Sequence, residues 1–385
     1  MFAITALNKI AQKGLDLFDS DFSFTDDAGE AQGILVRSHD MLNMELSEKL
    51  LAIARAGAGV NNIPVDVCSA RGIVVFNTPG ANANAVKELV LAGLFLSSRD
   101  IVSGITWAKS LTEDIAKNVE KGKSKFAGNE IKGKTLGVIG LGAIGVMVAN
   151  AASALGMKVA GYDPFLSVKA ALELTNKINL YDKLEGILPQ CDYITIHVPY
   201  MEGTKNMIGE TQFSQMRDGV RLLNFSRDAI INERDLISAI DSGKVHRYVT
   251  DFPNEHVASH HHVICIPHLG ASTEESEENC AVMAAEQLVD YLKNGNITNS
   301  VNYPDCSMGK CHTAGRIAVL HRNIPSMIGR ITSLMADKDI NISDMTNRSK
   351  GEYQYTLVDV DSHVEKQDLE ALRTINGIIA VRIVK

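Results

Sequence analysis

The chain has 385 residues, and several features that would assign it to a broad class are missing. No apolar stretch approaches the roughly 20 residues needed to cross a bilayer. Acidic residues outnumber basic ones, 46 to 38, so the net charge of −8 provides no general attraction for nucleic acid or an anionic membrane. The first residues show no basic segment followed by a long apolar core, so no signal peptide is expected. An anionic substrate would therefore need local positive charge.

Closely spaced cysteines are also missing. The six cysteines lie far apart and form no CxxC pair, at Cys68, Cys191, Cys265, Cys280, Cys306 and Cys311. We expect free thiols in the cytoplasm rather than disulfides or a metal site. The run His260–His262 is predicted to be a surface loop, because three consecutive histidines cannot easily face one ion.

Short apolar runs alternate with helical segments along most of the chain. In the first 80 residues they lie at Ala3–Leu7, Gly33–Val36, Leu50–Arg55 and Ile73–Phe76. Between Gly133 and Pro267, strand candidates follow at Asp192–Val198, Gly219–Asn224, Arg247–Thr250 and Val263–Ile266. This alternation predicts an α/β protein with two Rossmann-like, doubly wound parallel sheets. The helical stretch Ala85–Leu96 is expected to lead away from the first of these units, and Ser276–Asn294 to carry the chain back to it.

The last 70 residues have a different order of elements. A linker at 303–315 contains Pro304 and Gly309. The segments that follow are a strand, a helix, two strands, a helix and a strand: Arg316–Leu320, Pro325–Asp337, Asp339–Met345, Tyr353–Asp361, Lys366–Thr374 and Ile378–Val384. The order β-α-β-β-α-β predicts a small ferredoxin-like domain over residues 316–385.

A glycine motif at the start of the second sheet predicts a dinucleotide site. Gly140, Gly142 and Gly145 form G-x-G-x-x-G between an apolar strand and a helix that begins near Ala143 and Ile144. The first glycine permits a tight turn, the second allows the pyrophosphate to approach, and the third lets helix and strand pack closely. Asp163 ends the next strand, 18 residues after Gly145. Its carboxylate would bind the ribose hydroxyls of NAD and repel the additional phosphate of NADP.

Ionisable residues follow three further strand candidates. Arg227 stands in NFSR, Glu255 in DFPNE and His268 in PHLGAST. The carboxyl ends of parallel strands meet at one edge of a sheet, so these side chains can converge. An imidazole is a suitable base near neutral pH, and a guanidinium binds a carboxylate through its planar fork.

Taken together, GLGAIG, Asp163, HVP at His197–Pro199, NFSR, DFPNE and PHLGAST resemble the D-isomer-specific 2-hydroxyacid dehydrogenases over about the first 300 residues. The resemblance implies NAD-dependent oxidation of a 2-hydroxy acid. His268 would take the hydroxyl proton, Glu255 would orient the imidazole, and Arg227 would bind the α-carboxylate. It also implies a discontinuous substrate-binding domain, 1–90 plus 275–302, around an NAD-binding domain at 91–274.

The resemblance further implies the cofactor contacts. They are Gly140, Gly142, Ala143, Ile144, Gly145, Asp163, His197, Val198, Pro199, Thr204, Ser226, Asp251, His268 and Gly270, with Asp251 as a partner of the nicotinamide carboxamide. Two departures from the family pattern are present. Asp228 replaces the usual glycine after the arginine, and the segment before Glu255 is one residue short.

The segments on the substrate side, RAGAGVNNIPVD and NTPGANANAVKEL, resemble family members that oxidise D-3-phosphoglycerate to 3-phosphohydroxypyruvate, the first step of L-serine synthesis. That substrate is a polyanion, and the resemblance implies contacts from Arg37, Ser38, Arg55, Gly57, Asn82 and Arg227. Lys87 is a weaker candidate because it can simply point to solvent.

The C-terminal segment resembles an ACT domain, a module that commonly binds amino acids. His321, Asn323 and Asn341 match residues that bind serine in regulated relatives, which suggests feedback inhibition by L-serine. Ser326 replaces a usual glycine. The alternative is an assembly module without an effector, and the resemblance favours a homodimer or homotetramer.

Two other functions remain compatible with the sequence. One is a related dehydrogenase acting on glycerate, glyoxylate or hydroxypyruvate. The other is a dinucleotide-sensing interaction protein of the corepressor type on the same fold. Arg37, Arg55 and the ACT-like segment favour the phosphorylated substrate, and the set of Arg227, Glu255 and His268 favours an enzyme.

Overall fold

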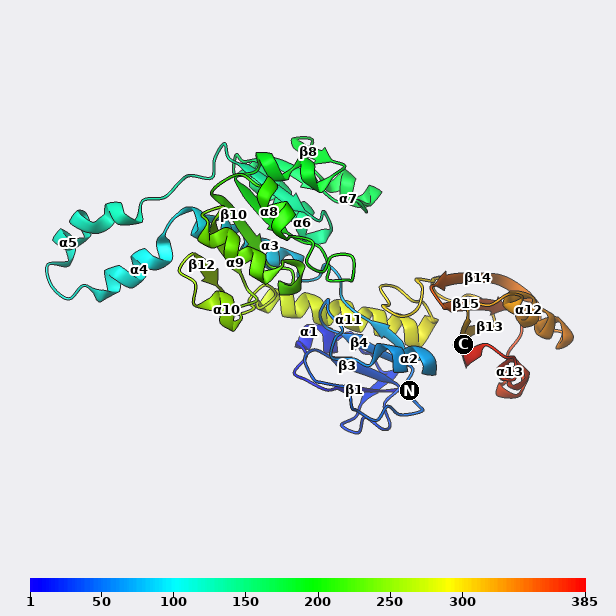
Figure 1. The fold of residues 1–385 in the computed structure, drawn as a ribbon. Helices are drawn as coiled ribbons and strands as arrows, with labels where there is room; N and C mark the ends of the chain where they lie inside the picture. Colours follow the sequence, from blue (N-terminus) through cyan, green and yellow to red (C-terminus); the bar gives the residue numbers. More distant parts are fainter. The chain divides into compact units, whose positions relative to one another are not determined.

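The computed structural model describes the backbone of residues 1–385 and every side chain except those of Lys366 and Asp368. The chain divides into two compact units, which are described separately (Figure 1). The first contains Met1–Asn82 and Glu274–Lys385, and the second contains Ala83–Thr273. Each unit is built around its own parallel sheet, and the first also carries an antiparallel sheet.

A five-stranded parallel sheet forms the first part of the first unit, in the order β2-β1-β3-β4-β5. Its strands are β1 (Phe2–Ala6), β2 (Phe22–Phe24), β3 (Gly33–Val36), β4 (Ala52–Arg55) and β5 (Val74–Phe76). Its helices are α1 (Gln12–Leu15), α2 (Val65–Arg71) and the long α11 (Glu274–Asn294). The four predicted strands are confirmed within two residues at either end. The short edge strand β2 was not predicted, because three residues carry too little periodicity.

A seven-stranded parallel sheet forms the second unit, in the order β12-β11-β10-β9-β6-β7-β8, so its doubly wound topology is confirmed. Its strands are β6 (Thr135–Ile139), β7 (Lys158–Tyr162), β8 (Ile178–Tyr181), β9 (Tyr193–Ile196), β10 (Val220–Asn224), β11 (Val245–Thr250) and β12 (Val263–Cys265). Its α-helices are α3 (Ala83–Ser98), α4 (Ile101–Ser110), α5 (Ile115–Gly122), α6 (Ala143–Ala154), α7 (Val168–Glu173), α8 (Glu210–Gln215), α9 (Glu233–Asp241) and α10 (Glu255–Ala258). Short 3-10 turns are η1 (Lys123–Phe126), η2 (Leu184–Gly186), η3 (Leu188–Gln190) and η4 (Asp228–Ile230).

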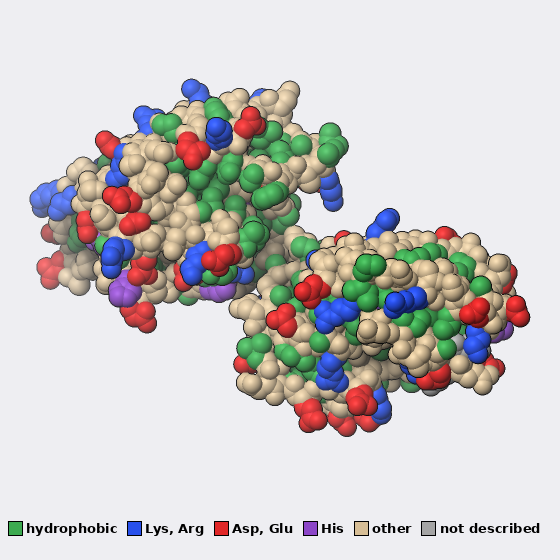
Figure 2. All heavy atoms as spheres, turned by 45° about the vertical axis from the view of Figure 1, so that its right-hand side comes forward, with side chains coloured by type: hydrophobic (Ala, Val, Ile, Leu, Met, Phe, Trp, Pro, Cys, Tyr) green, Lys and Arg blue, Asp and Glu red, His purple; other side chains and the backbone are tan. Residues whose placement is uncertain are grey.

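Over the part of the chain that the structure describes, no single helix is long and apolar enough to cross a membrane. The pair α3 and α4 taken together reaches that length and composition, but the two helices meet at a bend of 68°. On the face drawn in Figure 2, side chains of both charges are interspersed rather than gathered by sign.

The C-terminal segment forms a four-stranded antiparallel sheet in the order β14-β15-β13-β16, with two helices. The elements are β13 (Gly315–Arg322), α12 (Met327–Asp337), β14 (Ile342–Lys350), β15 (Tyr353–Val360), α13 (Lys366–Arg373) and β16 (Ile378–Ile383). The predicted ferredoxin-like topology is confirmed. The strand predicted at Asp339–Met345 was placed too early, because Asp339 adopts a left-handed φ of 53° and β14 begins only at Ile342.

This antiparallel sheet shares a hydrophobic core with the first sheet of the same unit. Leu320 and Tyr355 pack into a buried cluster with Tyr291 and Leu292 near the end of α11. The Arg382 guanidinium also donates to the carbonyl oxygen of Tyr291 at 2.6 Å. The C-terminal segment is therefore built onto the first sheet through α11.

Candidate active site

The glycine turn after β6 has the geometry that its sequence predicts. Gly140 has a φ of 90°, and a Cβ on Gly145 would lie 1.9 Å from the Gly140 carbonyl oxygen. The tight turn and the close helix–strand contact therefore both require glycine. Gly142 precedes the first residue of α6, Ala143, and a Cβ there would meet no atom within 4 Å. The backbone at Gly142 faces open space beside the N-terminus of α6.

Asp163 directly follows β7 and lies beside this turn. Its Oδ2 accepts a hydrogen bond from the Leu141 backbone N–H at 2.8 Å, and its Oδ1 accepts one from the Phe165 N–H, also at 2.8 Å. A cavity of about 240 Å³ lies here, lined by Leu141, Gly142, Ala143, Val146, Asp163, Phe165, Ser167, Lys169, Ala170 and Glu173. Lys169 and Glu173 were not predicted, because only their place on α7 brings them to the cavity.

The residues from His197 to Thr204 and those around Ser226 form one hydrogen-bonded loop pair. The Ser226 hydroxyl donates to the Val198 carbonyl oxygen, and the Thr204 hydroxyl donates to that of Pro199 at 2.7 Å. Asn224, which was not singled out from the sequence, is fully buried below them. Its amide donates to the Arg227 carbonyl oxygen at 2.8 Å, which fixes the start of the arginine loop.

His197 is held as a neutral imidazole. Its Nε2 lies 2.9 Å from the Thr195 hydroxyl, while its buried Nδ1 has no hydrogen-bond partner among the described residues. Burial lowers the pKa of His197 to about 3. The Nδ1 atom is therefore a polar group that a bound ligand can satisfy.

This burial predicts a stability that depends on pH. An unfolded histidine has a pKa near 6.5, so below that pH the unfolded chain binds a proton that the folded chain refuses. Stability from this site is complete above about pH 6.5 and falls as the pH approaches 3, by up to about 1.4 kcal/mol per unit. Urea unfolding at pH 6.5 and 5.0 should show a smaller loss for His197→Asn than for wild type. The exposed His261→Asn should match wild type, and equal losses in all three proteins would contradict the expectation.

Arg227 and His268 both lie close to the Phe252 ring. The Phe252 ring centroid is 4.7 Å from that of His268 and 5.7 Å from the Arg227 Cζ. His268 adopts a left-handed φ of 39°, and its backbone N–H donates to the Asp251 carbonyl oxygen at 3.0 Å. The ends of β10, β11 and β12 thus bring a cation and an imidazole to one aromatic ring. Phe252 was not singled out from the sequence.

Glu255 does not lie against His268 in this arrangement. It is the exposed first residue of α10, and no ion pair or hydrogen bond joins the two side chains, both of which are described. The buried acid beneath the histidine loop is Asp251, whose Oδ2 accepts from the Gly270 N–H at 3.0 Å. Burial raises the pKa of Asp251, and the charges of His268 and Arg227 oppose that rise. The predicted convergence thus brings together Arg227 and His268 but leaves Glu255 apart.

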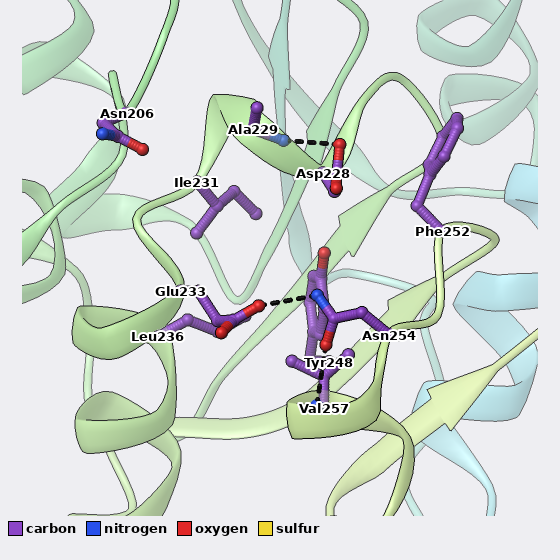
Figure 3. Close-up of a pocket in the computed structure, with 10 residues that line it drawn as sticks. All are labelled: Asn206, Asp228, Ala229, Ile231, Glu233, Leu236, Tyr248, Phe252, Asn254 and Val257. Atoms are coloured by element: carbon purple, nitrogen blue, oxygen red, sulfur yellow. Dashed lines mark hydrogen bonds between the residues drawn. The ribbon is translucent and has the colours of Figure 1, made fainter.

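A second cavity of about 240 Å³ opens beside the arginine loop (Figure 3). Asp228, Glu233 and Asn254 are among its polar lining residues, and Glu233 accepts a hydrogen bond from the Asn254 amide at 2.6 Å. Asp228 stands at the start of the 3-10 turn η4, where its Oδ1 accepts from the Ala229 N–H at 2.8 Å. Asp228 is not among the residues with a left-handed φ, so this backbone does not require the usual glycine.

The residues predicted to bind substrate lie mostly at the carboxyl end of the first sheet. Arg37 follows β3 and Arg55 ends β4, two neighbouring strands. The Arg37 guanidinium is 2.7 Å from a Glu277 carboxylate oxygen, and 39% of its side chain is exposed. Gly57 has a φ of 155°, and a Cβ there would lie 2.5 Å from the Arg55 guanidinium. The Arg55 side chain thus packs against the Gly57 backbone, in the space that the Cβ of another residue would occupy.

Three further residues on the substrate side can be placed. Ser38 is exposed next to Arg37, and Asn82 immediately precedes α3. Lys87 lies on α3, and its amine is 3.5 Å from a Glu88 carboxylate oxygen. Lys9, which was not predicted, follows β1, the strand beside β3, and adds an exposed cation to the same end of the sheet. No motif marks a lysine at that position.

The predicted effector residues do not come together within one chain. His321 is fully buried, and its Nε2 lies 2.9 Å from the Thr356 hydroxyl. Asn323 follows β13 beside the turn before Tyr353, and its amide donates to the Gly351 carbonyl oxygen. Asn341 precedes β14 and donates to Asp361, beyond the other end of β15. Eight residues of β15 separate the two asparagines, about 25 Å of extended chain.

The second unit fits a dinucleotide on several independent grounds. The open backbone at Gly142 and the N–H groups of α6 suit a pyrophosphate, and the cavity beside Asp163 suits a ribose. Buried polar atoms without partners in the described structure, Asp251 Oδ1 and His197 Nδ1, lie near the other end of the site. A carboxylate oxygen and an imidazole nitrogen are suited to bind an amide group.

Comparison with known proteins identifies the family. The model of the D-isomer specific 2-hydroxyacid dehydrogenase NAD binding domain matches residues 98–270. The chain is 30% identical to the D-3-phosphoglycerate dehydrogenase of Haemophilus influenzae over 363 residues, 91% of this chain and 85% of that protein. It is 35% identical to the Rattus norvegicus enzyme of the same name, matching 71% of this chain but only 51% of the relative, about half its length.

A solved structure agrees with these similarities. The NAD+-bound 3-phosphoglycerate dehydrogenase of Entamoeba histolytica superposes with a TM-score of 0.63 at 28% identity, covering 78% of this chain and 98% of that one. The site geometry, the domain match and the near full-length relative agree: the chain belongs to the D-isomer-specific 2-hydroxyacid dehydrogenases.

Proposed function

We propose that this chain oxidises D-3-phosphoglycerate to 3-phosphohydroxypyruvate with NAD as the hydride acceptor. The observation that carries the proposal is the local positive charge at the carboxyl end of the first sheet of an acidic protein. Arg37, Arg55 and Lys9 gather there from three adjacent strands. Relatives that match the chain almost end to end carry the corresponding name. We place the enzyme in the cytoplasm, where its six free cysteines remain reduced.

The residues of the second unit would perform the chemistry. NAD bound along the glycine turn supplies the acceptor for the hydride. His268 takes the proton of the substrate hydroxyl at a ring nitrogen, and the Arg227 guanidinium binds the α-carboxylate and polarises the carbonyl that forms. The Phe252 ring lies close to both side chains and forms an aromatic surface beside them.

Glu255 is assigned to stabilise the imidazolium, which requires its carboxylate to reach His268 in the substrate complex. Catalytic contacts often tighten only there. Asp251 is the competing candidate because it is buried beneath the same loop. Comparing kcat for Glu255→Gln and Asp251→Asn decides between them. We expect the larger loss for Glu255→Gln, while a larger loss for Asp251→Asn with unchanged NADH affinity would transfer the role to Asp251.

The substrate assignment is tested by NADH oxidation with four keto acids. We expect kcat/KM for 3-phosphohydroxypyruvate to exceed that for hydroxypyruvate, pyruvate and glyoxylate by at least about 100-fold, because two charge-assisted contacts to phosphate contribute roughly 3 kcal/mol. A preference for glyoxylate or hydroxypyruvate would favour the related dehydrogenases. Binding of NADH without turnover of any substrate would favour the interaction protein.

We also propose that L-serine regulates the enzyme through the ACT-like segment of a homo-oligomer. Asn323 and Asn341 lie at opposite ends of β15, so a pocket using both amides would combine them from two copies of the chain. L-serine should inhibit wild type and leave Asn323→Ala and Asn341→Ala active but insensitive, while D-serine serves as the control. If L-serine does not inhibit the wild-type enzyme, the ACT-like segment would instead serve as an assembly module.

A further inference from the structure

One side chain at the carboxyl end of the first sheet is bonded in an unusual way. Asn8 lies two residues after β1, and its Oδ1 accepts hydrogen bonds from three consecutive backbone N–H groups. The N–H of Arg37 is at 3.1 Å, that of Ser38 at 3.0 Å and that of His39 at 2.8 Å. Successive N–H groups turned toward one point form a nest that elsewhere binds anions. Here the nest is occupied by the Oδ1 of Asn8, from the loop that follows the adjacent strand β1.

The carbonyl groups of the same loop are also held. The Arg55 Nε donates to the Arg37 carbonyl oxygen at 3.1 Å, and the Asn62 amide donates to that of His39 at 2.7 Å. The loop is therefore bonded on its donor side by Asn8 and on its acceptor side by two other residues. Loss of Asn8 would leave three N–H groups without their shared acceptor.

The loop matters because it carries Arg37. The Arg37 side chain is 39% exposed, and one guanidinium nitrogen lies 2.7 Å from a Glu277 carboxylate oxygen, so the guanidinium keeps donors for an anionic ligand. A long side chain can present its head group reproducibly only if its backbone is fixed. The position of the Arg37 backbone depends on Asn8.

We propose that Asn8 is a positioning residue for substrate recognition, and this inference rests on the proposed function. Asn8 holds the Arg37–His39 backbone so that Arg37 meets the phosphate of the substrate. Asn8 does not contact the reacting atoms. The N–H groups it occupies are not substrate contacts, because their shared acceptor is supplied by the protein itself.

The test measures KM and kcat for 3-phosphohydroxypyruvate and hydroxypyruvate, with NADH as the reductant. Asn8→Leu keeps the branched shape of the side chain but removes the acceptor. It should raise KM for the phosphorylated acid about tenfold, change KM for hydroxypyruvate less than threefold, and leave kcat and NADH affinity unchanged. Asn8→Asp retains an acceptor oxygen and should return the ratio of the two KM values to within about threefold of wild type.

A matched control is available on β1, the strand that precedes Asn8. The buried Thr5 hydroxyl donates to the Thr25 carbonyl oxygen at 2.8 Å, away from the Arg37 loop. Thr5→Val should lower thermal stability without changing the ratio of KM values. If Asn8→Leu does not fold, Asn8→Ser is the substitute. The serine side chain is polar but too short to reach the three N–H groups, so it should give the same rise in KM for the phosphorylated acid.

Several results would overturn the role of Asn8. One is an unchanged KM ratio in Asn8→Leu, and another is a lower KM for the phosphorylated acid, which would mean that the freed N–H groups bind it. Equal effects of Asn8→Leu and Asn8→Asp would also exclude positioning through the acceptor oxygen. If wild type does not prefer the phosphorylated acid, the proposed function fails, and that result is separate from the comparison of variants.

Discussion

Replacing His268 by asparagine is expected to lower kcat by about 10²- to 10⁴-fold, the usual contribution of a positioned base. Asparagine is the informative replacement because it tolerates the left-handed φ of 39° at this position better than alanine does. The backbone hydrogen bond from His268 to Asp251 does not involve the ring and should persist. Stopped-flow measurement of NADH oxidation and fluorescence titration of NADH would separate turnover from cofactor binding.

The expected pattern is lost turnover with NADH affinity within a few-fold of wild type. His268→Ala should lose kcat to the same extent and show a somewhat larger loss of stability. The exposed His261→Asn serves as the control for removal of a histidine and should retain full activity. A kcat for His268→Asn within threefold of wild type would exclude His268 as the base.

Replacing Arg316 by methionine is expected to lower the free energy of unfolding of the first unit by about 3 to 5 kcal/mol. Arg316 is fully buried, and its Nε and Nη2 donate to the two Asp359 oxygens at 2.5 and 2.8 Å. Its Nη1 also donates to the carbonyl oxygens of Asn294 and Gly309. Methionine would leave the Asp359 carboxylate buried without its partner.

Urea unfolding followed by circular dichroism provides the measurement. The double variant Arg316→Met with Asp359→Leu removes both charges and should recover much of the loss, because the uncompensated carboxylate is then absent. Arg373→Met removes an exposed pair with Glu370 in the same segment and should cost less than about 1 kcal/mol. If Arg316→Met and Arg373→Met were equally stable, Arg316 would not be a structural anchor.

The geometry of the glycine turn could be predicted from sequence because its signals are local. The glycine spacing encodes a turn, and in the structure Gly140 has a left-handed φ and Gly145 leaves no space for a Cβ. Asp163 lies beside that turn because it directly follows β7, the next strand of the same βαβ unit. Both features depend on contacts between neighbours along the chain or in adjacent strands.

The arrangement of the proposed catalytic side chains was predicted less completely. Arg227 and His268 follow strands whose ends meet, so topology alone brings them to the same edge. The place of Phe252 close to both, and the separation of Glu255 from His268, depend on how one shortened loop packs. A pattern of residue types contains no information about that packing.

The sequence by itself determined the order of elements, the dinucleotide motif, the acid that follows β7 and the family resemblance. Each of these depends only on residue spacing and local periodicity. Only the tertiary structure decided three other matters. These are the hydrogen bonds between Asn8 and the Arg37 loop, the burial of Arg316 against Asp359, and the location of Asn323 and Asn341 at opposite ends of β15. Each depends on strand pairing and burial between residues distant in sequence, which no local pattern specifies.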